Sequence, residues 1–201
     1  RRRDFLRPAR SGRLYASSAT RMFRMPIDKN LDLALLEHRH ASMLFALVDE
    51  NREHLRRYLP WVDGTRSVND SMVYIQTTLE QFARSQSLNC GIFHHGALAG
   101  VIGYHTIDWV NRRTAIGYWL ASSWEGHGIM TRSVRALTAH GFTALGLHRL
   151  EIRAAVENRR SRTVAERSGY NFEGICRGAE WLHDRFVDHA VYGALAPEWK
   201  A

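Results

Sequence analysis

The sequence has 201 residues, of which 45% are hydrophobic and 24% are charged, and its formal net charge is +8. This composition suffices for one domain with its own hydrophobic core and leaves too little for two. No run of residues approaches the roughly eighteen apolar positions that a membrane-spanning helix needs, so we expect no membrane partner.

Most of the charge lies in residues 1–24, which carry eight arginines and one acid, Asp4, or +7 of the total of +8. This segment has little apolar surface to bury, so we expect a disordered leader, followed by one folded domain over residues 25–201. Its origin stays open between native sequence, vector-derived sequence and a targeting sequence. A specific nucleic-acid footprint would lie on the folded surface, so the charge does not predict a nucleic-acid partner.

The hydrophobic periodicity of the first half predicts helices between strands. Asn51 interrupts one helical pattern, Pro60 ends it, and Ser67 offers a cap for the next helix. The predicted elements are a strand at 31–37, helices at 40–59 and 67–84, and strands at 88–94, 97–108 and 114–120, with a turn at His95-Gly96.

The second half predicts a long helix after Gly126-His127-Gly128, with Gly146 as its stop signal. The predicted elements are helices at 129–145 and 161–167, a strand at 150–156, and an antiparallel pair at 174–182 and 187–195 with Asp184-Arg185 at the turn. The order β, α, α, β, β, β, α, β, α, β, β indicates one α/β domain without internal repeats.

The sharpest feature is a strand that runs through a glycine-containing turn into the long helix. The start of a helix presents free N–H donors and the positive end of its dipole. Glycines such as Gly126 and Gly128 let an anion approach the backbone closely. A phosphate or diphosphate is therefore the expected ligand, although the turn matches neither a Rossmann fingerprint nor a P-loop.

Further short motifs accompany this turn. They are Asn51-Arg52-x-x-Leu55, Leu59-Pro60-Trp61, Ile116-Gly117-Tyr118-Trp119-Leu120, Gly126-x-Gly128-Ile129-Met130, Asn158-x-x-Ser161, Ala165-Glu166-Arg167-x-Gly169-Tyr170 and Phe172-Glu173-Gly174. In this order and spacing they resemble the GNAT acetyltransferases, and in particular the RimJ/RimL type, which acetylates protein N-termini. The resemblance spans about residues 29–199 and departs at Ser123, where the family usually has Gln or Arg.

The resemblance implies the GNAT fold, an α/β (α+β) single domain with a central mixed, mostly antiparallel, splayed sheet flanked by helices. It implies acetyl-CoA as co-substrate and no metal, and it suggests a homodimer. The backbone of Trp119 and Leu120 would pair with the pantetheine arm, and Asn158 and Ser161 would contact the cofactor. The diphosphate would be held by amides around Gly126, His127, Gly128, Ile129, Met130 and Thr131.

In RimL-like enzymes a carboxylate deprotonates the amine through water and a serine protonates the departing thiolate; the matching positions are Glu180 and Ser161. From the residues alone, Glu180 is an ordinary solvated glutamate and Ser161 a helix N-cap. The candidates for lining the acceptor groove are Trp61, Tyr104, His105 and Trp181. Residues of these types more often have structural roles.

The two cysteines, Cys90 and Cys176, are far apart in the sequence and indicate neither a disulfide scaffold nor a metal site. We expect both to be small buried residues in a reducing, cytoplasmic environment. The histidines show no spacing typical of metal ligands.

The leading interpretation is acetyl transfer to the N-terminal α-amino group of a protein such as a ribosomal protein. The nearest alternative acceptor is a small amine, namely an aminoacyl-nucleotide, an aminoglycoside or a polyamine. A polyamine favours an acidic cleft, whereas a peptide favours a longer open groove. A non-catalytic CoA-binding module is a third interpretation, which the presence of both Glu180 and Ser161 disfavours.

Overall fold

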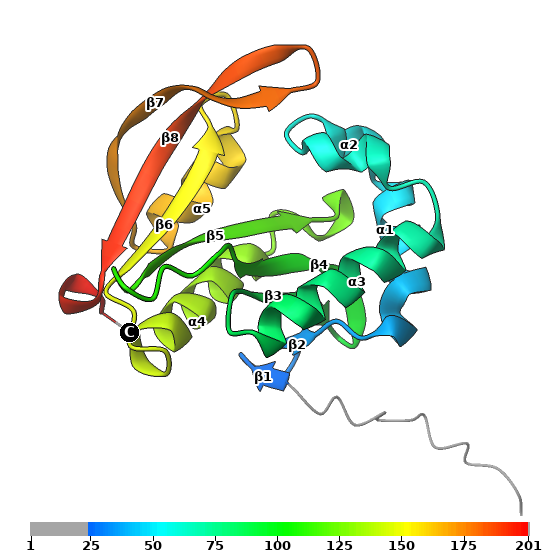
Figure 1. The fold of residues 1–201 in the computed structure, drawn as a ribbon, viewed down its shortest axis with the longest axis horizontal. Helices are drawn as coiled ribbons and strands as arrows, with labels where there is room; N and C mark the ends of the chain where they lie inside the picture. The colour runs from blue at the N-terminus through cyan, green and yellow to red at the C-terminus, as the bar shows by residue number, and fades with distance from the viewer. Residues whose placement is uncertain (1–23, 201) are drawn as a thin grey trace, which may run out of the picture.

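The structure is a computed structural model that describes residues 24–200, which form an eight-stranded sheet with helices on both faces (Figure 1). The strand order is β1-β2-β3-β4-β5-β6-β8-β7, and every neighbouring pair is antiparallel except β5 and β6. The predicted class, one domain with a mixed and mostly antiparallel sheet, is therefore confirmed.

The strands are β1 (Arg24–Pro26), β2 (Leu31–Leu35), β3 (Leu88–His94), β4 (Ala97–Tyr104), β5 (Arg113–Leu120), β6 (Arg149–Ala155), β7 (Asn171–Leu182) and β8 (Arg185–Leu195). The helices are α1 (Ala41–Glu50), α2 (Arg52–Arg56), α3 (Val68–Ala83), α4 (Ile129–Thr143) and α5 (Arg159–Arg167), with short 3₁₀ helices that include η2 (Pro60–Gly64) and η3 (Ser122–Trp124). In the described part of the chain, no helix combines the length and the apolar character needed to cross a membrane.

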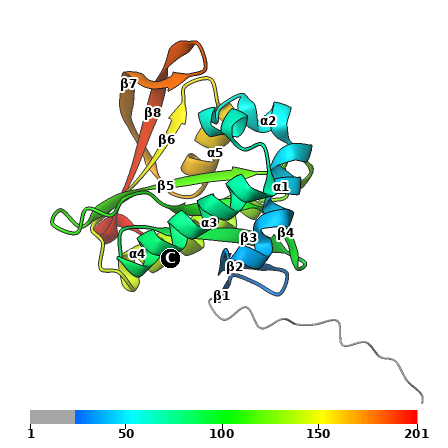
Figure 2. The same cartoon turned by 45° about the vertical axis from the view of Figure 1, so that its right-hand side comes forward.

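The sheet opens between β5 and β6. These two strands pair only from Arg113 with Arg149 to Ala115 with Glu151. Beyond that point β6 follows β8 and β7 away from β5, so that the two halves of the sheet form a V (Figures 1 and 2). The backbone groups of β5 at residues 116–120 therefore have no strand partner on the β6 side, and such groups seek hydrogen bonds elsewhere.

The core has two parts because side chains alternate between the faces of a strand. On one face, residues such as Ile116 and Tyr192 pack with α4 and α5. On the other face, residues such as Val101 pack with α1 and α3, and Trp119 lies against this second cluster. The sheet thus separates a side covered by α4 and α5 from a side covered by α1 and α3, which we call the α2 side because α2 follows α1.

Most predicted elements are confirmed, including the helix break at Asn51 and the cap at Ser67, whose hydroxyl accepts a bond from the N–H of Asp70. Strand β1 was not predicted, because three residues are too few to show a periodicity. Arg24, placed in the leader by its composition, pairs with Ala34 in this strand. The prediction for residues 1–23 lies outside the described residues.

Two further predictions are corrected. The turn between β7 and β8 consists of His183, with a φ of 58°, and Asp184, because Leu182 pairs with Arg185, which already belongs to β8. Cys90 is buried as expected, but Cys176 is exposed. The reason is that β7 is the last strand of the sheet and most of its residues face solvent.

Candidate functional site

The loop between β5 and α4 presents a row of free backbone donors. Gly128 is the N-cap of α4 with a φ of 68°, no side chain caps this helix, and Gly126 has a φ of 79°. Among the described residues, no N–H group from residue 126 to residue 131 has a hydrogen-bond partner. Such donors at the positive end of a helix bind anions, which agrees with the diphosphate site predicted from the sequence.

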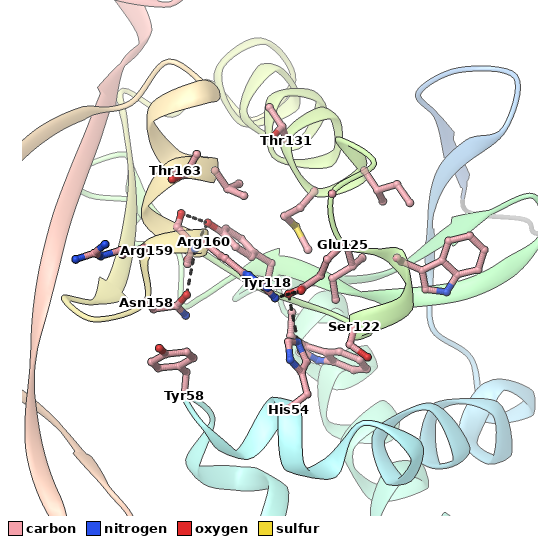
Figure 3. A pocket seen from close by; sticks show the side chains of 18 of the residues that line it. His54, Tyr58, Tyr118, Ser122, Glu125, Thr131, Asn158, Arg159, Arg160 and Thr163 are labelled. Atoms are coloured by element: carbon pink, nitrogen blue, oxygen red, sulfur yellow. Dashed lines mark hydrogen bonds and ion pairs between the residues drawn. The ribbon is translucent and has the colours of Figure 1, made fainter.

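A cleft of about 910 Å³ adjoins these donors (Figure 3). Its walls are α2, the end of β5, the first turn of α4 and the first turn of α5. The predicted cofactor residues that line it are Trp119, Leu120, Gly126, Gly128, Ile129, Met130, Thr131, Asn158 and Ser161. The side chain of His127 is exposed and does not line the cleft, so its predicted contribution rests on its backbone amide.

The cleft fits coenzyme A in two independent respects. The unpartnered amides of the glycine turn match a diphosphate, and the unpaired edge of β5 at residues 116–120 offers hydrogen bonds to an amide-containing arm such as pantetheine. A Cβ atom added at Gly126 or Gly128 would meet no atom within 4 Å, so the approach to the amides is open.

Ser161 lies on α5 and contacts Tyr118 of β5. Its Oγ atom donates to the Tyr118 hydroxyl at 3.1 Å, and this hydroxyl donates to the carbonyl oxygen of Ser161 at 3.1 Å. The N-cap of α5 is Asn158, whose side chain accepts from the Ser161 N–H. The hydroxyl of Ser161 is therefore not needed for capping, and it lies in the wall of the cleft.

Two contacts hold the cleft together across long sequence distances. The side-chain oxygen of Asn51 accepts bonds from both the N–H and the hydroxyl of Ser122, each at 2.9 Å, and this fixes the loop that leads to the glycines. The carboxylate of Glu125 pairs with His54 of α2 at 3.3 Å and with Arg160 of α5 (Figure 3). Glu125 thus connects the two helices that flank the entrance to the glycine turn.

A second polar surface lies on the strands that leave β5. Ile152 of β6 and Ala190 of β8 point into the core under α4 and α5, so their neighbours Arg153 and His189 point to the opposite side. The charged and titratable side chains that gather there are Arg149, Glu151, Arg153, Glu173, Glu180 and His189. We call this set the charged face.

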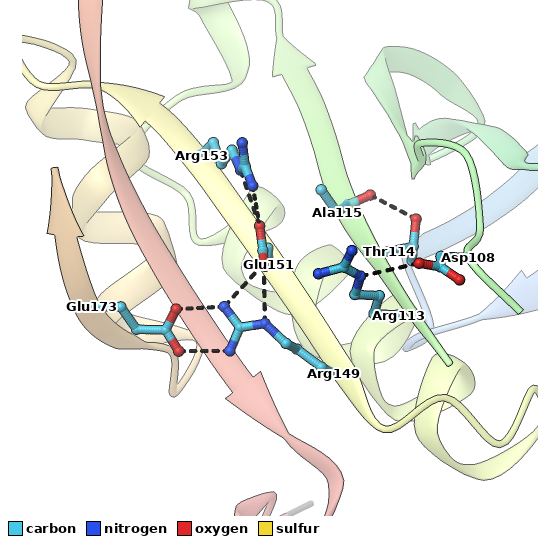
Figure 4. A network of polar contacts seen from close by, with 8 residues as sticks. All are labelled: Asp108, Arg113, Thr114, Ala115, Arg149, Glu151, Arg153 and Glu173. Carbon is cyan, nitrogen blue, oxygen red and sulfur yellow. Dashed lines mark hydrogen bonds and ion pairs between the residues drawn. The ribbon is translucent and has the colours of Figure 1, made fainter. Parts of the chain in front are cut away.

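Ion pairs order the charged face. Arg149 donates to both carboxylate oxygens of Glu173 and, at 3.0 Å, to Glu151, which also accepts two bonds from Arg153 (Figure 4). The Glu180 carboxylate lies farther along the strands, where its Oε2 atom is 3.2 Å from Nε2 of His189. Two arginines thus face three glutamates, so the surface is close to charge-balanced.

The tip of the β7–β8 hairpin meets the segment around α2. Nε2 of His183 donates to the carbonyl oxygen of Arg56 at 2.7 Å. Nearby, the hydroxyl of Tyr58 donates to the carbonyl oxygen of Glu157, between β6 and α5, at 3.4 Å. These contacts bridge the V of the sheet on its α2 side (Figure 1). Both the cleft and the charged face therefore border on α2 and the segment that follows it.

The four candidate acceptor residues have different surroundings. Trp61 of η2 is 40% exposed and its ring lies 6.0 Å from that of Trp119. His105 is exposed and lies over Gly117, whose added Cβ would be 2.7 Å from its Nε2 atom. Both positions are on the α2 side of the sheet, where they remain candidates.

Tyr104 is a correction, and the role of Trp181 stays a prediction. Tyr104 is 1% exposed and donates to the carbonyl oxygen of Leu137 at 2.5 Å, so it belongs to the core and the prediction that it lines a groove is wrong. Trp181 follows Glu180 on a regular stretch of β7 and packs on Phe186, so it points to the face opposite Glu180.

Several residues of the site were not predicted from the sequence, among them Tyr118, His54, Glu125 and His189. Tyr118 stands inside a recognised motif, and its alternation with Trp119 could have placed it against α5. The pairing of His54 with Glu125 and of His189 with Glu180 has no local signal, because tertiary contacts create it. The described residues contain no cluster of His, Cys, Asp and Glu suited to a metal ion.

Comparison with known proteins agrees with this geometry. Residues 30–171 match the model of the acetyltransferase (GNAT) domain. The ribosomal-protein-serine acetyltransferase of Escherichia coli (strain K12) is 30% identical over 169 residues, which cover 84% of this chain and 94% of that protein. The solved structure of RimL, a ribosomal L7/L12 alpha-N-protein acetyltransferase in complex with coenzyme A, has a TM-score of 0.83 with 29% identity over 86% of this chain and 97% of that one.

A further solved structure contains a nucleotide together with acetyl-CoA. The microcin C7 self immunity acetyltransferase MccE, in complex with acetyl-CoA and AMP, has a TM-score of 0.81 with 25% identity, and the match covers 84% of this chain and 94% of that one.

Proposed function

Because the chain belongs to the GNAT acetyltransferase family and is an acetyl-CoA-dependent N-acetyltransferase, we propose that its acceptor is the N-terminal α-amino group of a protein such as a ribosomal protein. The observation that carries this proposal is the charged face. It runs along the seven residue pairs between β6 and β8, or roughly 20 Å, which suits several residues of an extended peptide. The similarity to RimL supports the same acceptor.

The charge of the charged face argues against a polyamine as the acceptor. A polyamine carries several positive charges and binds best where acidic side chains are in excess. Here Arg149 and Arg153 are paired with Glu151 and Glu173, which leaves Glu180 as the carboxylate without an arginine partner on the charged face. The single carboxylate without an arginine partner, that of Glu180, matches an acceptor that carries one amino group.

In the proposed reaction, Glu180 accepts a proton from the amine through water, since a free α-amino group has a pKa near 7.7–8.0 and must be neutral to attack. Ser161 donates its hydroxyl proton to the thiolate that leaves when the amide bond forms, and the proton that Glu180 has taken up returns to the serine through water. Acetyl-CoA, as substrate, supplies the acetyl group as a thioester. The free amides at residues 126–131 and the edge of β5 hold it in line with the amine.

A small-molecule amine such as an aminoacyl-nucleotide is the second candidate acceptor. It is favoured by the similarity to MccE, whose solved structure is a complex with both acetyl-CoA and AMP. A homodimer and a cytoplasmic location are part of the proposal and rest on the resemblance to the RimJ/RimL type.

The experiment that tests the acceptor is a thiol-release assay with acetyl-CoA and matched amines. Peptides that begin with Ser or Ala are compared with the same peptides blocked at the N-terminus, with spermidine, with an aminoglycoside and with an aminoacyl-nucleotide analogue. We expect turnover with the free peptides and none with the blocked ones, even when these contain lysine. Turnover with only the small amines would overturn the proposed acceptor and leave the acetyltransferase assignment intact.

The proposed base is tested by Glu180→Gln, which removes the proton acceptor and keeps the shape of the side chain. We expect a fall in kcat of about a hundredfold or more with an unchanged Kd for coenzyme A. Wild-type turnover in this variant would remove Glu180 from the mechanism.

A further inference from the structure

The contact between Glu180 and His189 depends on an irregularity in β7. Cys176 pairs with His189 and Glu180 pairs with Val187, so four steps along β7 correspond to two steps along β8. In a regular ladder residue 180 would lie opposite Arg185, four residues from His189. The bulge moves Glu180 two positions along the partner strand and brings its carboxylate within reach of the imidazole.

Other residues stabilise this bulge. Gly178 has a φ of 58°, and its N–H donates to a side-chain oxygen of Asp188 at 2.8 Å. A bulge that contains a left-handed residue and its own side-chain anchor is a specific feature, and bulges commonly redirect a side chain beside a site. The feature that it creates here is the pair of Glu180 and His189.

The two partners differ in accessibility. The side chain of His189 is 15% exposed and that of Glu180 is 34% exposed. Within the described residues, the imidazole of His189 makes no other side-chain hydrogen bond. The more buried residue, His189, contacts one carboxylate oxygen of Glu180, Oε2, while the Glu180 side chain remains partly accessible to solvent.

We propose that His189 is a positioning residue for Glu180: its Nε2–H group holds Oε2 and leaves Oε1 free to accept the proton of the amine. This inference rests on the proposed role of Glu180 as base. A carboxylate on a strand near a hairpin end otherwise samples several rotamers, and catalysis loses rate when the base is misplaced.

The test is a double-mutant cycle with a conservative control. His189→Leu removes the donor, and His189→Gln places an amide N–H near the position of Nε2. We expect His189→Leu to lower kcat by at least about tenfold, with the KM for acetyl-CoA within about twofold because the glycine turn is untouched. His189→Gln is expected to recover most of the rate. In the Glu180→Gln background, His189→Leu is expected to cause no further loss.

Each contrary outcome has a distinct meaning. Wild-type kcat in His189→Leu, equal losses in His189→Leu and His189→Gln, or losses that multiply in the double variant would overturn the positioning role. Full activity of Glu180→Gln would show that the proposed role of Glu180 as base is wrong, whatever the His189 variants do.

Asp188→Ala provides a second test in case His189→Leu does not fold. It releases the anchor of the bulge without changing either partner and is expected to lower kcat in the same way, and an unchanged kcat there would also count against the inference.

Discussion

Ser161 and Tyr118 form two hydrogen bonds in the wall of the cleft: Ser161 Oγ donates to the phenol, and the phenol donates to the Ser161 carbonyl oxygen, both at 3.1 Å. Burial raises the pKa of Tyr118, so the phenol stays protonated. It is therefore a hydrogen-bond donor within reach of the serine oxygen in the proposed step, in which the serine proton moves to the thiolate.

This arrangement predicts unequal effects of two substitutions. Ser161→Ala is expected to lower kcat by about a hundredfold, because the proton donor is lost. Tyr118→Phe is expected to cost less, because the serine remains. Both effects are measured by steady-state kinetics. The thermal midpoint of Ser161→Ala should match that of the wild type, since Asn158 still caps α5, and an unchanged kcat would exclude Ser161 as the acid.

The glycine turn offers a matched pair of substitutions at the two ends of one helix. Gly128 precedes α4 and Gly146 follows it, both have φ near +65°, and neither has an atom within 4 Å of an added Cβ. Alanine at either site should cost roughly 1–2 kcal/mol of stability through left-handed strain. Only Gly128→Ala is expected to weaken coenzyme A binding, by about tenfold or more in calorimetry. Equal Kd values for the two variants would contradict the anion site.

The core position of Tyr104 gives a prediction about stability. Tyr104→Phe removes a buried hydrogen bond to the carbonyl oxygen of Leu137 and should lower the free energy of unfolding by about 1 kcal/mol. The kcat and the KM for the acceptor should not change, because the ring does not reach the acceptor side. Urea unfolding and kinetics check both points, and an altered acceptor KM would reinstate Tyr104 as a groove residue.

The charged face predicts a pH effect. The hydrogen bonds from Arg149 hold the pKa of Glu173 below its ordinary value of 4.5. A carboxylate whose pKa is lower in the folded state contributes stability above its unfolded pKa and loses it as the pH falls through the folded pKa. Because the Glu173 side chain is exposed to solvent, which screens the ion pair, its contribution should stay below about 1 kcal/mol.

Urea unfolding of the wild type and Glu173→Gln at several pH values measures this contribution. The difference in unfolding free energy should be constant at neutral pH and shrink below about pH 4.5. A difference that persists unchanged in acid would mean that packing, and not the ion pair, accounts for it.

The sequence predicted those features that depend on neighbouring residues. The break at Asn51, the cap at Ser67 and the turn at His95-Gly96 each follow from one or two residues whose preferred backbone geometry is local. The short strand β1 escaped prediction, since three residues show no period. The glycine turn and the start of the next helix were expected for the same local reason, because they are adjacent in the chain, and residues of both line the cleft.

What the sequence by itself determined was the order of strands and helices, the free helix start at Gly128 and the family to which these motifs belong. Only the tertiary structure decided that Tyr104 is buried, that Trp181 points away from Glu180, and that Ser161 meets Tyr118. It also decided the pairing of Glu180 with His189, which depends on a shift of two residues in strand register. Periodicity shows that a segment is a strand, but the pairing of a strand is set by its neighbours, so contacts across strands are fixed only when the sheet assembles.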